Sequence, residues 1–167
     1  KLVLDQGYWP DGILTPPSDE AIQFDIKAAK EMGFNGARKH QKLEDPRFLY
    51  WADRLGFLVS SEMANAYLYD DQYVARFTRE WIEAVERDYN HPSIVMWVPF
   101  NEGWGQYDTE RVTAWTKAHD PTRLVNNASG WTDKGAGDTV DIHSYPGPDM
   151  PKLEDKRAAV LGEFGGL

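Results

Sequence analysis

Two glutamates stand at the ends of apolar segments in this 167-residue sequence. Glu102 follows Asn101 after the apolar run 94–100, and Glu163 closes the run that begins at residue 158. Carboxylates at the carboxyl ends of parallel strands lie on one face, which is where barrel enzymes carry out chemistry. A pair of carboxyl groups on either side of a bond is the arrangement that glycoside hydrolysis needs. We therefore predict that Glu102 and Glu163 form one site.

Three tryptophans, Trp9, Trp104 and Trp131, each come just after a predicted strand, where a flat ring can stack on the face of a sugar. For each of them, packing beneath a loop is the alternative that the sequence leaves open. The tryptophans at positions 51, 81 and 115 have helical core spacing, and we interpret them as structural. The four histidines show no metal-ligand spacing, so we predict no metal site and no cofactor.

The elements that must position these side chains alternate between strand and helix. Ser18 is typical of a helix N-cap, and this first helix is expected to end near Gly33. The pair Asp45-Pro46 begins a second helix, which Gly56 ends. The pattern therefore predicts two strand–helix units in the first third of the chain.

A third helix is expected over residues 73–89 and a fourth over 109–119, with Asp108 as its N-cap. In the fourth helix Val112, Trp115 and Ala118 are expected to face inward. The predicted strands span residues 2–4, 36–39, 57–61, 94–100, 124–128, 140–145 and 158–161.

This alternation predicts a parallel sheet of the α/β class. We predict a (β/α)8 TIM barrel that is incomplete in this chain, with about seven strands present and the eighth missing. A doubly wound sheet is the structural alternative, but no Gly-rich phosphate turn follows the first strand.

The composition narrows the function classes. The formal net charge of −9 argues against a nucleic-acid partner and against docking on anionic membranes. No apolar run is long enough to span a bilayer. The sequence has no Cys, which excludes disulfide scaffolds and thiolate metal sites and leaves the compartment open.

The chain resembles the barrel domain of glycoside hydrolase family 2, the family of β-galactosidases, β-glucuronidases and β-mannosidases. The most specific match is the stretch from His91 to Glu102, and the Asp-Pro-Thr-Arg segment at 120–123 follows it. Segments 34–38 and 50–56 resemble the second strand and its helix. The resemblance covers nearly the whole chain. It implies that residues 1–167 are a catalytic barrel domain within a longer chain, with β-sandwich domains on its N-terminal side.

The resemblance also implies roles for single residues. Glu102 would be the acid/base and Glu163 the nucleophile of a retaining exo-β-glycosidase. Such an enzyme hydrolyses terminal β-linked sugars by double displacement through a covalent glycosyl-enzyme. Arg38 and Tyr145 match the positions that keep the nucleophile ionised. Asn101 matches the residue that binds the sugar 2-hydroxyl.

His40 and His143 also stand beside predicted strand ends, and we place them among the substrate-binding candidates. A His in such a place is also often a hydrogen-bonded core residue. For Arg38 and Tyr145 the alternative is a purely structural role, as an ion-pair or hydrogen-bond partner.

Three segments depart from the β-galactosidase pattern. Residues 5–10 read Asp-Gln-Gly-Tyr-Trp-Pro in place of an Asn-x-His-Glu-like segment. Residues 38–41 read Arg-Lys-His-Gln in place of Arg-x-Ser-His, and residues 61–65 read Ser-Glu-Met-Ala-Asn in place of Asp-Glu-Ala-Asn. These segments shape the sugar pocket, so the sugar and its linkage stay open.

Two other functions remain as alternatives: a non-catalytic carbohydrate-binding barrel, and an unrelated metal-dependent hydrolase. Because the eighth strand and the β-sandwich domains lie outside this chain, we expect the chain alone to be poorly stable and inactive.

Overall fold

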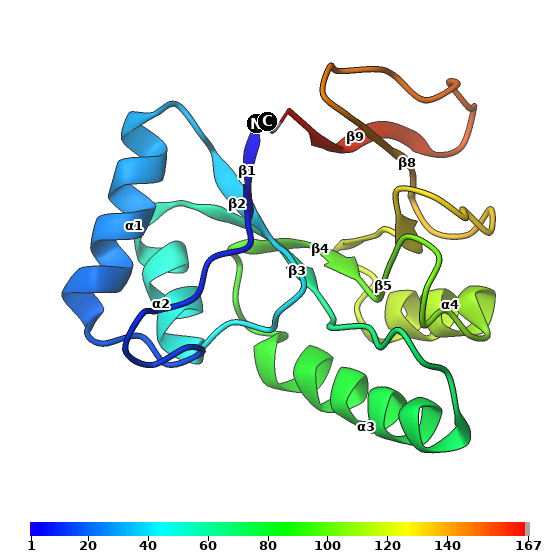
Figure 1. The fold of residues 1–167 in the computed structure, drawn as a ribbon, viewed down its shortest axis with the longest axis horizontal. Coiled ribbons are helices and arrows are strands. Elements are labelled where there is room, and N and C mark those ends of the chain that lie inside the picture. The colour runs from blue at the N-terminus through cyan, green and yellow to red at the C-terminus, as the bar shows by residue number, and fades with distance from the viewer. Residues whose placement is uncertain (166–167) are drawn as a thin grey trace.

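The computed structural model describes residues 1–165, in which strands and helices alternate as predicted (Figure 1). The last two residues of the predicted domain, 166 and 167, lie outside the described residues. The helices are α1 (Asp19–Glu31), α2 (Pro46–Leu55), α3 (Asp71–Asp88) and α4 (Thr109–His119). The strands are β1 (Leu2–Asp5), β2 (Gly36–Lys39), β3 (Leu58–Glu62), β4 (Ile94–Val98), β5 (Phe100–Asn101), β6 (Leu124–Val125), β7 (Ala128–Ser129), β8 (Thr139–Ser144) and β9 (Ala158–Phe164).

All strand pairs are parallel, and neighbours follow chain order. One sheet runs β1-β2-β3-β4-β6, while β5 pairs with β7 and β8 with β9. The Asp138 N–H donates to the Val125 carbonyl at 2.8 Å, which joins β6 to the start of β8. A doubly wound sheet would reverse its strand order at a switch point, and the described sheet has no such reversal. The fold is therefore a partial (β/α)8 TIM barrel, as predicted.

Two predicted strands are each divided in two. Pro99 separates β4 from β5, because proline has no N–H to give to a sheet. Asn126 and Asn127 separate β6 from β7. Both residues are buried, and their side-chain amides donate hydrogen bonds to Asp141 and Asp133. With β4–β5 and β6–β7 each counted as one position, the described residues fill seven positions of the barrel wall.

The helix signals in the sequence are confirmed for α1 and α2. The Ser18 hydroxyl accepts the Ala21 N–H at 3.2 Å, and Asp45 accepts the Arg47 N–H at 2.8 Å. Gly56 ends α2 with φ of +64°, a conformation that glycine adopts at little cost. Helix α3 begins two residues before the predicted start, with Asp70 as its N-cap.

For α4, the predicted N-cap position is confirmed without its capping bond, and one of the inward-facing residues is wrong. Asp108 stands at the N-cap position but makes no capping bond, and its carboxylate lies 2.9 Å from Arg111 instead. Ala118 is exposed. The buried face of α4 is lined by Thr109, Thr113 and Thr116. Thr116 is buried because its hydroxyl accepts the Trp81 indole N–H at 2.9 Å, a need that apolar spacing does not reveal.

The hydrophobic core fills the layer between the strands and the covering helices (Figure 1). Ile26 and Trp81 are each 1% exposed, and Phe77 stacks on Phe100 with ring centroids 5.0 Å apart. Burial of one large apolar side chain stabilises a fold by about 1.5–3 kcal/mol, so this layer supplies most of the stability. Trp81, Trp51 and Trp115 all belong to the core or pack against it, as predicted.

Polar and charged side chains face the inside of the barrel, among apolar ones. Strands β1 and β9 flank a cavity of about 280 Å³, and no hydrogen-bonded pairing joins these two strands in residues 1–165. Arg38, Ser60 and Asp141 line the same cavity from other strands.

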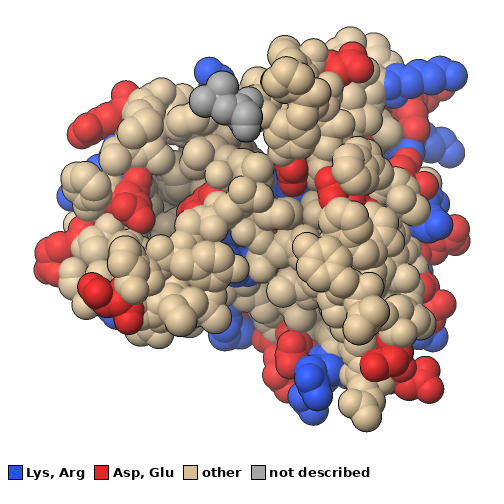
Figure 2. All heavy atoms as spheres, in the orientation of Figure 1, with Lys and Arg blue, Asp and Glu red and all other residues tan. Residues whose placement is uncertain are grey.

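None of the described helices combines the length and apolarity that a membrane span requires. Charged side chains lie mainly around the rim of the face shown in Figure 2.

Candidate active site

Glu102 follows β5 in a strained backbone conformation. Its φ of +54° falls in the left-handed region, which costs a non-glycine residue about 1–3 kcal/mol. Two contacts hold this conformation. The Glu102 N–H donates to the Ser129 carbonyl at 2.8 Å, and the Gln106 amide donates to the Glu102 carbonyl. Strain of this kind is typical of functional positions.

Glu163 lies in β9, where the pairing with β8 is irregular. The register shifts between Ile142 and His143, so that His143 is paired with Glu163 and Gly162 is skipped. The Glu163 carboxylate is 2.7 Å from Arg38 Nη1 and accepts the Tyr145 hydroxyl at 2.5 Å. The irregular pairing thus turns Glu163 into the polar interior, where Arg38 and Tyr145 bind it.

The structure brings Glu102 and Glu163 together around His143. An oxygen of each carboxylate and a ring nitrogen of His143 all lie within 4.8 Å of one another. His143 Nδ1 is 2.8 Å from Glu102 Oε1 and 3.5 Å from Glu163 Oε2. All three side chains are buried. The two glutamates therefore reach one small, largely desolvated site from the fourth and seventh wall positions.

Arg38 is the cationic centre of this site. It is 5% exposed, with Nε 2.6 Å from Glu62, Nη1 2.7 Å from Glu163 and Nη2 2.7 Å from the Asn101 side-chain oxygen. Burial opposes its charge, but Glu62 and Glu163 outweigh that effect and raise the pKa of Arg38. Arg38 is therefore both a structural ion-pair partner and a neighbour of Glu163.

Several effects act on the ionisation of Glu163. Burial favours the neutral acid, whereas the Tyr145 hydrogen bond and the charge of Arg38 favour the carboxylate, and together they lower the pKa of Glu163. Burial, together with the same contact, raises the pKa of Tyr145 to about 12, so its hydroxyl stays a donor at neutral pH. These contacts hold Glu163 as an ionised, positioned carboxylate.

His40 reaches the site through Glu62, a residue that sequence reasoning missed. His40 Nδ1 is 2.7 Å from Glu62 Oε1 and 3.7 Å from Glu163 Oε1. Glu62 is fully buried and binds both His40 and Arg38. The departure of segment 61–65 from the β-galactosidase pattern was the only signal near Glu62, and it gave no role. Ser129 and Asp141, also near the site, carried no sequence signal.

The aromatic candidates divide into two groups. Trp104 and Trp131 contact each other edge to face, with ring centroids 6.4 Å apart, and Trp131 is 55% exposed. Tyr67, absent from the sequence predictions, contacts Trp104 at 5.5 Å and is 80% exposed. Trp9 is half-buried and packs against the hydrophobic core.

Glu102, His143 and Glu163 also offer ligand atoms at distances that could suit a metal ion. The sequence spacing did not indicate this group, because its members lie far apart in the chain. Each of the three is hydrogen-bonded within the protein, and those contacts alone account for their arrangement.

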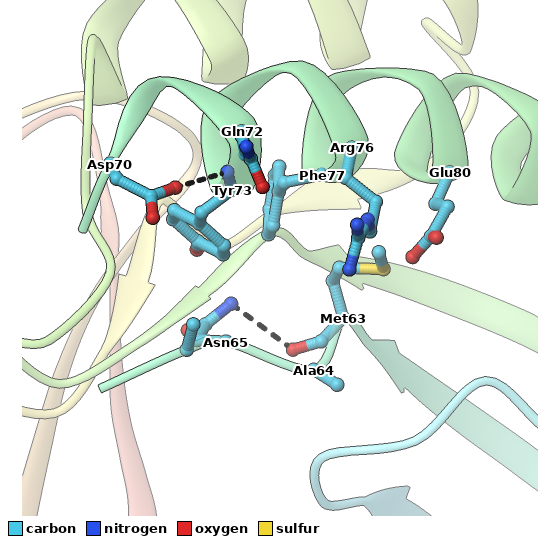
Figure 3. Close-up of a pocket in the computed structure, with 10 residues that line it drawn as sticks. Met63, Ala64, Asn65, Asp70, Gln72, Tyr73, Arg76, Phe77 and Glu80 are labelled. Carbon is cyan, nitrogen blue, oxygen red and sulfur yellow. Dashed lines mark hydrogen bonds between the residues drawn. The ribbon is translucent and has the colours of Figure 1, made fainter. Parts of the chain in front are cut away.

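A separate cavity of about 380 Å³ lies between α3 and the segment that follows β3 (Figure 3). Asn65, Tyr73, Arg76 and Phe77 are among the residues that line it. Asn65 joins the lining of this cavity to the site, because its amide nitrogen donates to the Met63 and Pro99 carbonyls while its oxygen accepts the Asn101 N–H at 2.7 Å. The loop after β3 thereby fixes the backbone just before Glu102.

A family model described as "Glycosyl hydrolases family 2, TIM barrel domain" matches residues 18–161 of this chain. Curated relatives include a β-galactosidase of Psychromonas ingrahamii, 32% identical over 84% of this chain and 15% of its own length. Another is a β-galactosidase of Vibrio cholerae, 32% identical over 87% of this chain and 17% of its own length. The chain thus spans about a sixth of these relatives.

Solved structures share the fold. An FMN-binding β-glucuronidase from Facaelibacterium prausnitzii superimposes with a TM-score of 0.74 over 87% of this chain and 25% of its own, at 24% identity. A glycosyl hydrolase family 2 member from Bacteroides cellulosilyticus has a TM-score of 0.57 and 32% identity over 69% of this chain and 16% of its own.

Proposed function

Because this chain belongs to glycoside hydrolase family 2 through its TIM barrel domain, we propose that the protein containing it is a retaining exo-β-glycosidase. It hydrolyses terminal β-linked sugars, with Glu163 as nucleophile and Glu102 as acid/base. The carbohydrate is the substrate, and residues 1–167 are one catalytic domain. β-Sandwich domains on the N-terminal side are part of the proposal, because the curated relatives are about six times longer than this chain.

One observation carries this proposal: carboxylate oxygens of Glu102 and Glu163 lie within 4.8 Å of each other. Retaining glycosidases have carboxyl groups about 5–5.5 Å apart, whereas inverting enzymes need about 6.5–9.5 Å to hold a water molecule between acid and base. The separation therefore supports direct attack by one carboxylate on the sugar.

In the first step a Glu163 oxygen attacks the anomeric carbon while the bond to the leaving oxygen breaks. Glu102 gives its proton to that oxygen. Two negative charges at this distance repel each other, so a single proton is held by the pair. Arg38 and Tyr145 bind the carboxylate of Glu163, which leaves Glu102 as the partner that carries the proton.

In the second step water attacks the anomeric carbon of the glycosyl-enzyme. Glu102, now a carboxylate, takes a proton from that water, and the bond between the sugar and Glu163 breaks. Net hydrolysis consumes one water and returns both side chains to their starting states. Because both attacks invert the anomeric carbon, the product keeps the β configuration.

Two further groups contact the sugar in this proposal. The Asn101 amide oxygen accepts from Arg38 at 2.7 Å, so its nitrogen end is the donor offered to the 2-hydroxyl. Trp104 and Trp131 provide flat rings close in sequence to Glu102 and Ser129 for stacking on the substrate. His40 and His143 act through the carboxylates that they contact and not on the sugar directly. Trp9 supports the loop after β1.

The test uses the full-length protein and a panel of 4-nitrophenyl β-galactoside, β-glucuronide and β-mannoside. For the substrate that is turned over, Glu163→Gly should abolish hydrolysis, and azide should restore turnover of a 2,4-dinitrophenyl glycoside as the α-glycosyl azide. Glu154→Gly, an exposed control, should keep wild-type activity. Failure of azide rescue would contradict the nucleophile assignment.

Two outcomes would favour the alternatives. Calorimetry that detects sugar binding without turnover on any of the panel would favour a carbohydrate-binding barrel. Loss of activity in chelator, restored by a divalent metal, would favour a metal-dependent hydrolase that uses the group around His143.

A further inference from the structure

Asp141 is a buried carboxylate that contacts β9, the strand of Glu163, and β7, the strand paired with β5, without touching either glutamate. Its Oδ2 accepts the Ser129 hydroxyl and the Asn126 amide, each at 2.6 Å. Its Oδ1 accepts the Gly162 N–H at 2.7 Å, one residue before Glu163. It is 3% exposed. A carboxylate held in this way links β9 to Ser129, whose carbonyl accepts the Glu102 N–H.

The contact with Ser129 continues to the acid/base. Ser129 Oγ is 3.0 Å from His143 Nε2, and His143 Nδ1 is 2.8 Å from Glu102 Oε1. An unbroken chain of hydrogen bonds therefore runs from Asp141 through Ser129 and His143 to Glu102.

This series of hydrogen bonds has a direction, because a carboxylate at Asp141 can only accept a hydrogen bond. Burial raises the pKa of Asp141, but the donors Ser129, Asn126 and Gly162 and the charge of Arg38 favour its carboxylate form. The ionised carboxylate accepts the Ser129 O–H, so the Ser129 oxygen accepts from His143 Nε2–H. In neutral imidazole the other nitrogen, Nδ1, is then an acceptor. Nδ1 faces Glu102, which must therefore donate its own proton in this hydrogen bond. Arg38 Nη1 also approaches Nε2, but at 3.3 Å it is farther than Ser129 and is engaged at 2.7 Å by Glu163.

Two glycines leave room for the side chains of Asp141 and His143. A Cβ on Gly162 would stand 2.4 Å from Asp141 Oδ1, and a Cβ on Gly130 would stand 2.5 Å from His143 Nδ1. Real Cβ contacts are longer than this, so the backbone is shaped around both side chains. Close fits of this kind limit how far the chain of hydrogen bonds can move.

Resting on the proposed function, we propose that Asp141 is a positioning residue for both glutamates. Through Ser129 and His143 it selects the imidazole tautomer that presents an acceptor to Glu102, which favours the protonated carboxyl group that the acid step needs. Through the Gly162 N–H it fixes the segment of β9 from which Glu163 attacks.

Asp141→Asn separates these two actions. The new amide oxygen can still accept from Gly162. The new amide nitrogen donates to Ser129. The Asn126 side-chain oxygen, which has no hydrogen-bond partner within residues 1–165, can accept the second amide proton after an amide flip. Ser129 then donates to His143 Nε2, and Nδ1–H faces Glu102. The substitution keeps the shape of the site and reverses the direction of the chain.

The experiment compares kcat/KM of the full-length protein on two aryl glycosides of the sugar that it cleaves. A phenyl glycoside needs acid assistance to leave, and a 2,4-dinitrophenyl glycoside does not. Asp141→Asn and Ser129→Ala should each lose about 10²-fold on the phenyl glycoside and less than about tenfold on the dinitrophenyl glycoside. Asp141→Ala should lose activity on both, because Gly162 also loses its acceptor.

Asp88→Asn is the matched control, since Asp88 is a buried carboxylate outside the site, paired with Arg87 at 2.6 Å. It should change both substrates equally and little. Equal losses on the two substrates in Asp141→Asn and Ser129→Ala, or wild-type rates on the phenyl glycoside, would overturn the proposal. If the wild-type protein cleaves no glycoside, the proposed function itself fails. This outcome differs from the two results that would overturn the role of Asp141.

Discussion

The two sides of the barrel wall use the same strands for opposite purposes. Outward-facing residues such as Ala37, Val59 and Trp97 enter a continuous apolar layer beneath the helices. Their inward-facing neighbours Arg38 and Ser60 line a polar interior. Successive strand residues point to opposite faces, so one short segment serves both sides. The outer side stabilises the fold, and the inner side holds buried charges in place at a cost in stability.

The largest expected effect comes from the charge at the centre of the inner side. Arg38→Met should lower kcat/KM by about 10²–10³-fold, because Glu163 loses a cation that holds its charge. It should also lower the free energy of unfolding by about 3–5 kcal/mol, since Glu62 and Glu163 stay buried without the guanidinium that balances their charges. Steady-state kinetics and urea unfolding measure both, with the exposed Arg79→Met as control. A normal rate in Arg38→Met would contradict its place in the site.

A substitution on the outer side should separate stability from activity. Ile26→Ala removes a fully buried side chain of α1 and should lower the free energy of unfolding by about 2–5 kcal/mol. Activity per folded molecule should not change, since the hydrogen-bond partners given above for the two glutamates do not include Ile26. Active-site titration with a mechanism-based inhibitor gives the folded fraction. A fall in kcat of the titrated enzyme would show that the two sides are not independent.

A buried carboxylate outside the site should affect stability with a predictable pH dependence. Burial favours neutral Asp120, but hydrogen bonds from Thr122, Trp97 and Arg123 outweigh it and hold the pKa of Asp120 at about 2. The native pKa lies below the unfolded one, so the stabilisation is complete above pH of about 4 and is lost toward pH of about 2.

Asp120→Asn should therefore cost about 1–3 kcal/mol at pH 7 without changing the rate. The free energy of unfolding of both proteins should be measured from pH 7 downward. The difference between the wild type and Asp120→Asn should shrink below pH of about 4. A gap that stays constant with pH would mean that the carboxylate charge at 120 contributes nothing.

The smallest expected effect comes from one hydrogen bond on the inner side. Tyr145→Phe removes the donor to Glu163 and should lower kcat/KM about tenfold. Since that bond helps to lower the pKa of Glu163, its loss raises this pKa, and activity should disappear at a higher pH as the solution is acidified. The pH profile of kcat/KM measures the shift. Tyr50→Phe, on an exposed face of α2, should leave the profile in place.

The sequence by itself determined the order of the elements and the places of Glu102 and Glu163. Helix caps and glycine stops such as Ser18 and Gly56 act within a few residues, so they can be read locally. Apolar runs likewise report the outer side of the wall. The family motif around Asn101 and Glu102 added the assignment of roles, which periodicity alone does not contain.

Only the tertiary structure decided which polar side chains of the inner side contact one another. Glu62, Ser129 and Asp141 are polar residues in short strands, and nothing in their local sequence distinguishes them from exposed polar residues. They become partners of the site because strands far apart in the chain curve around one interior, where a buried charge must find an opposite charge or a hydrogen bond. Such long-range pairing depends on closure of the wall, and spacing along the sequence does not record it.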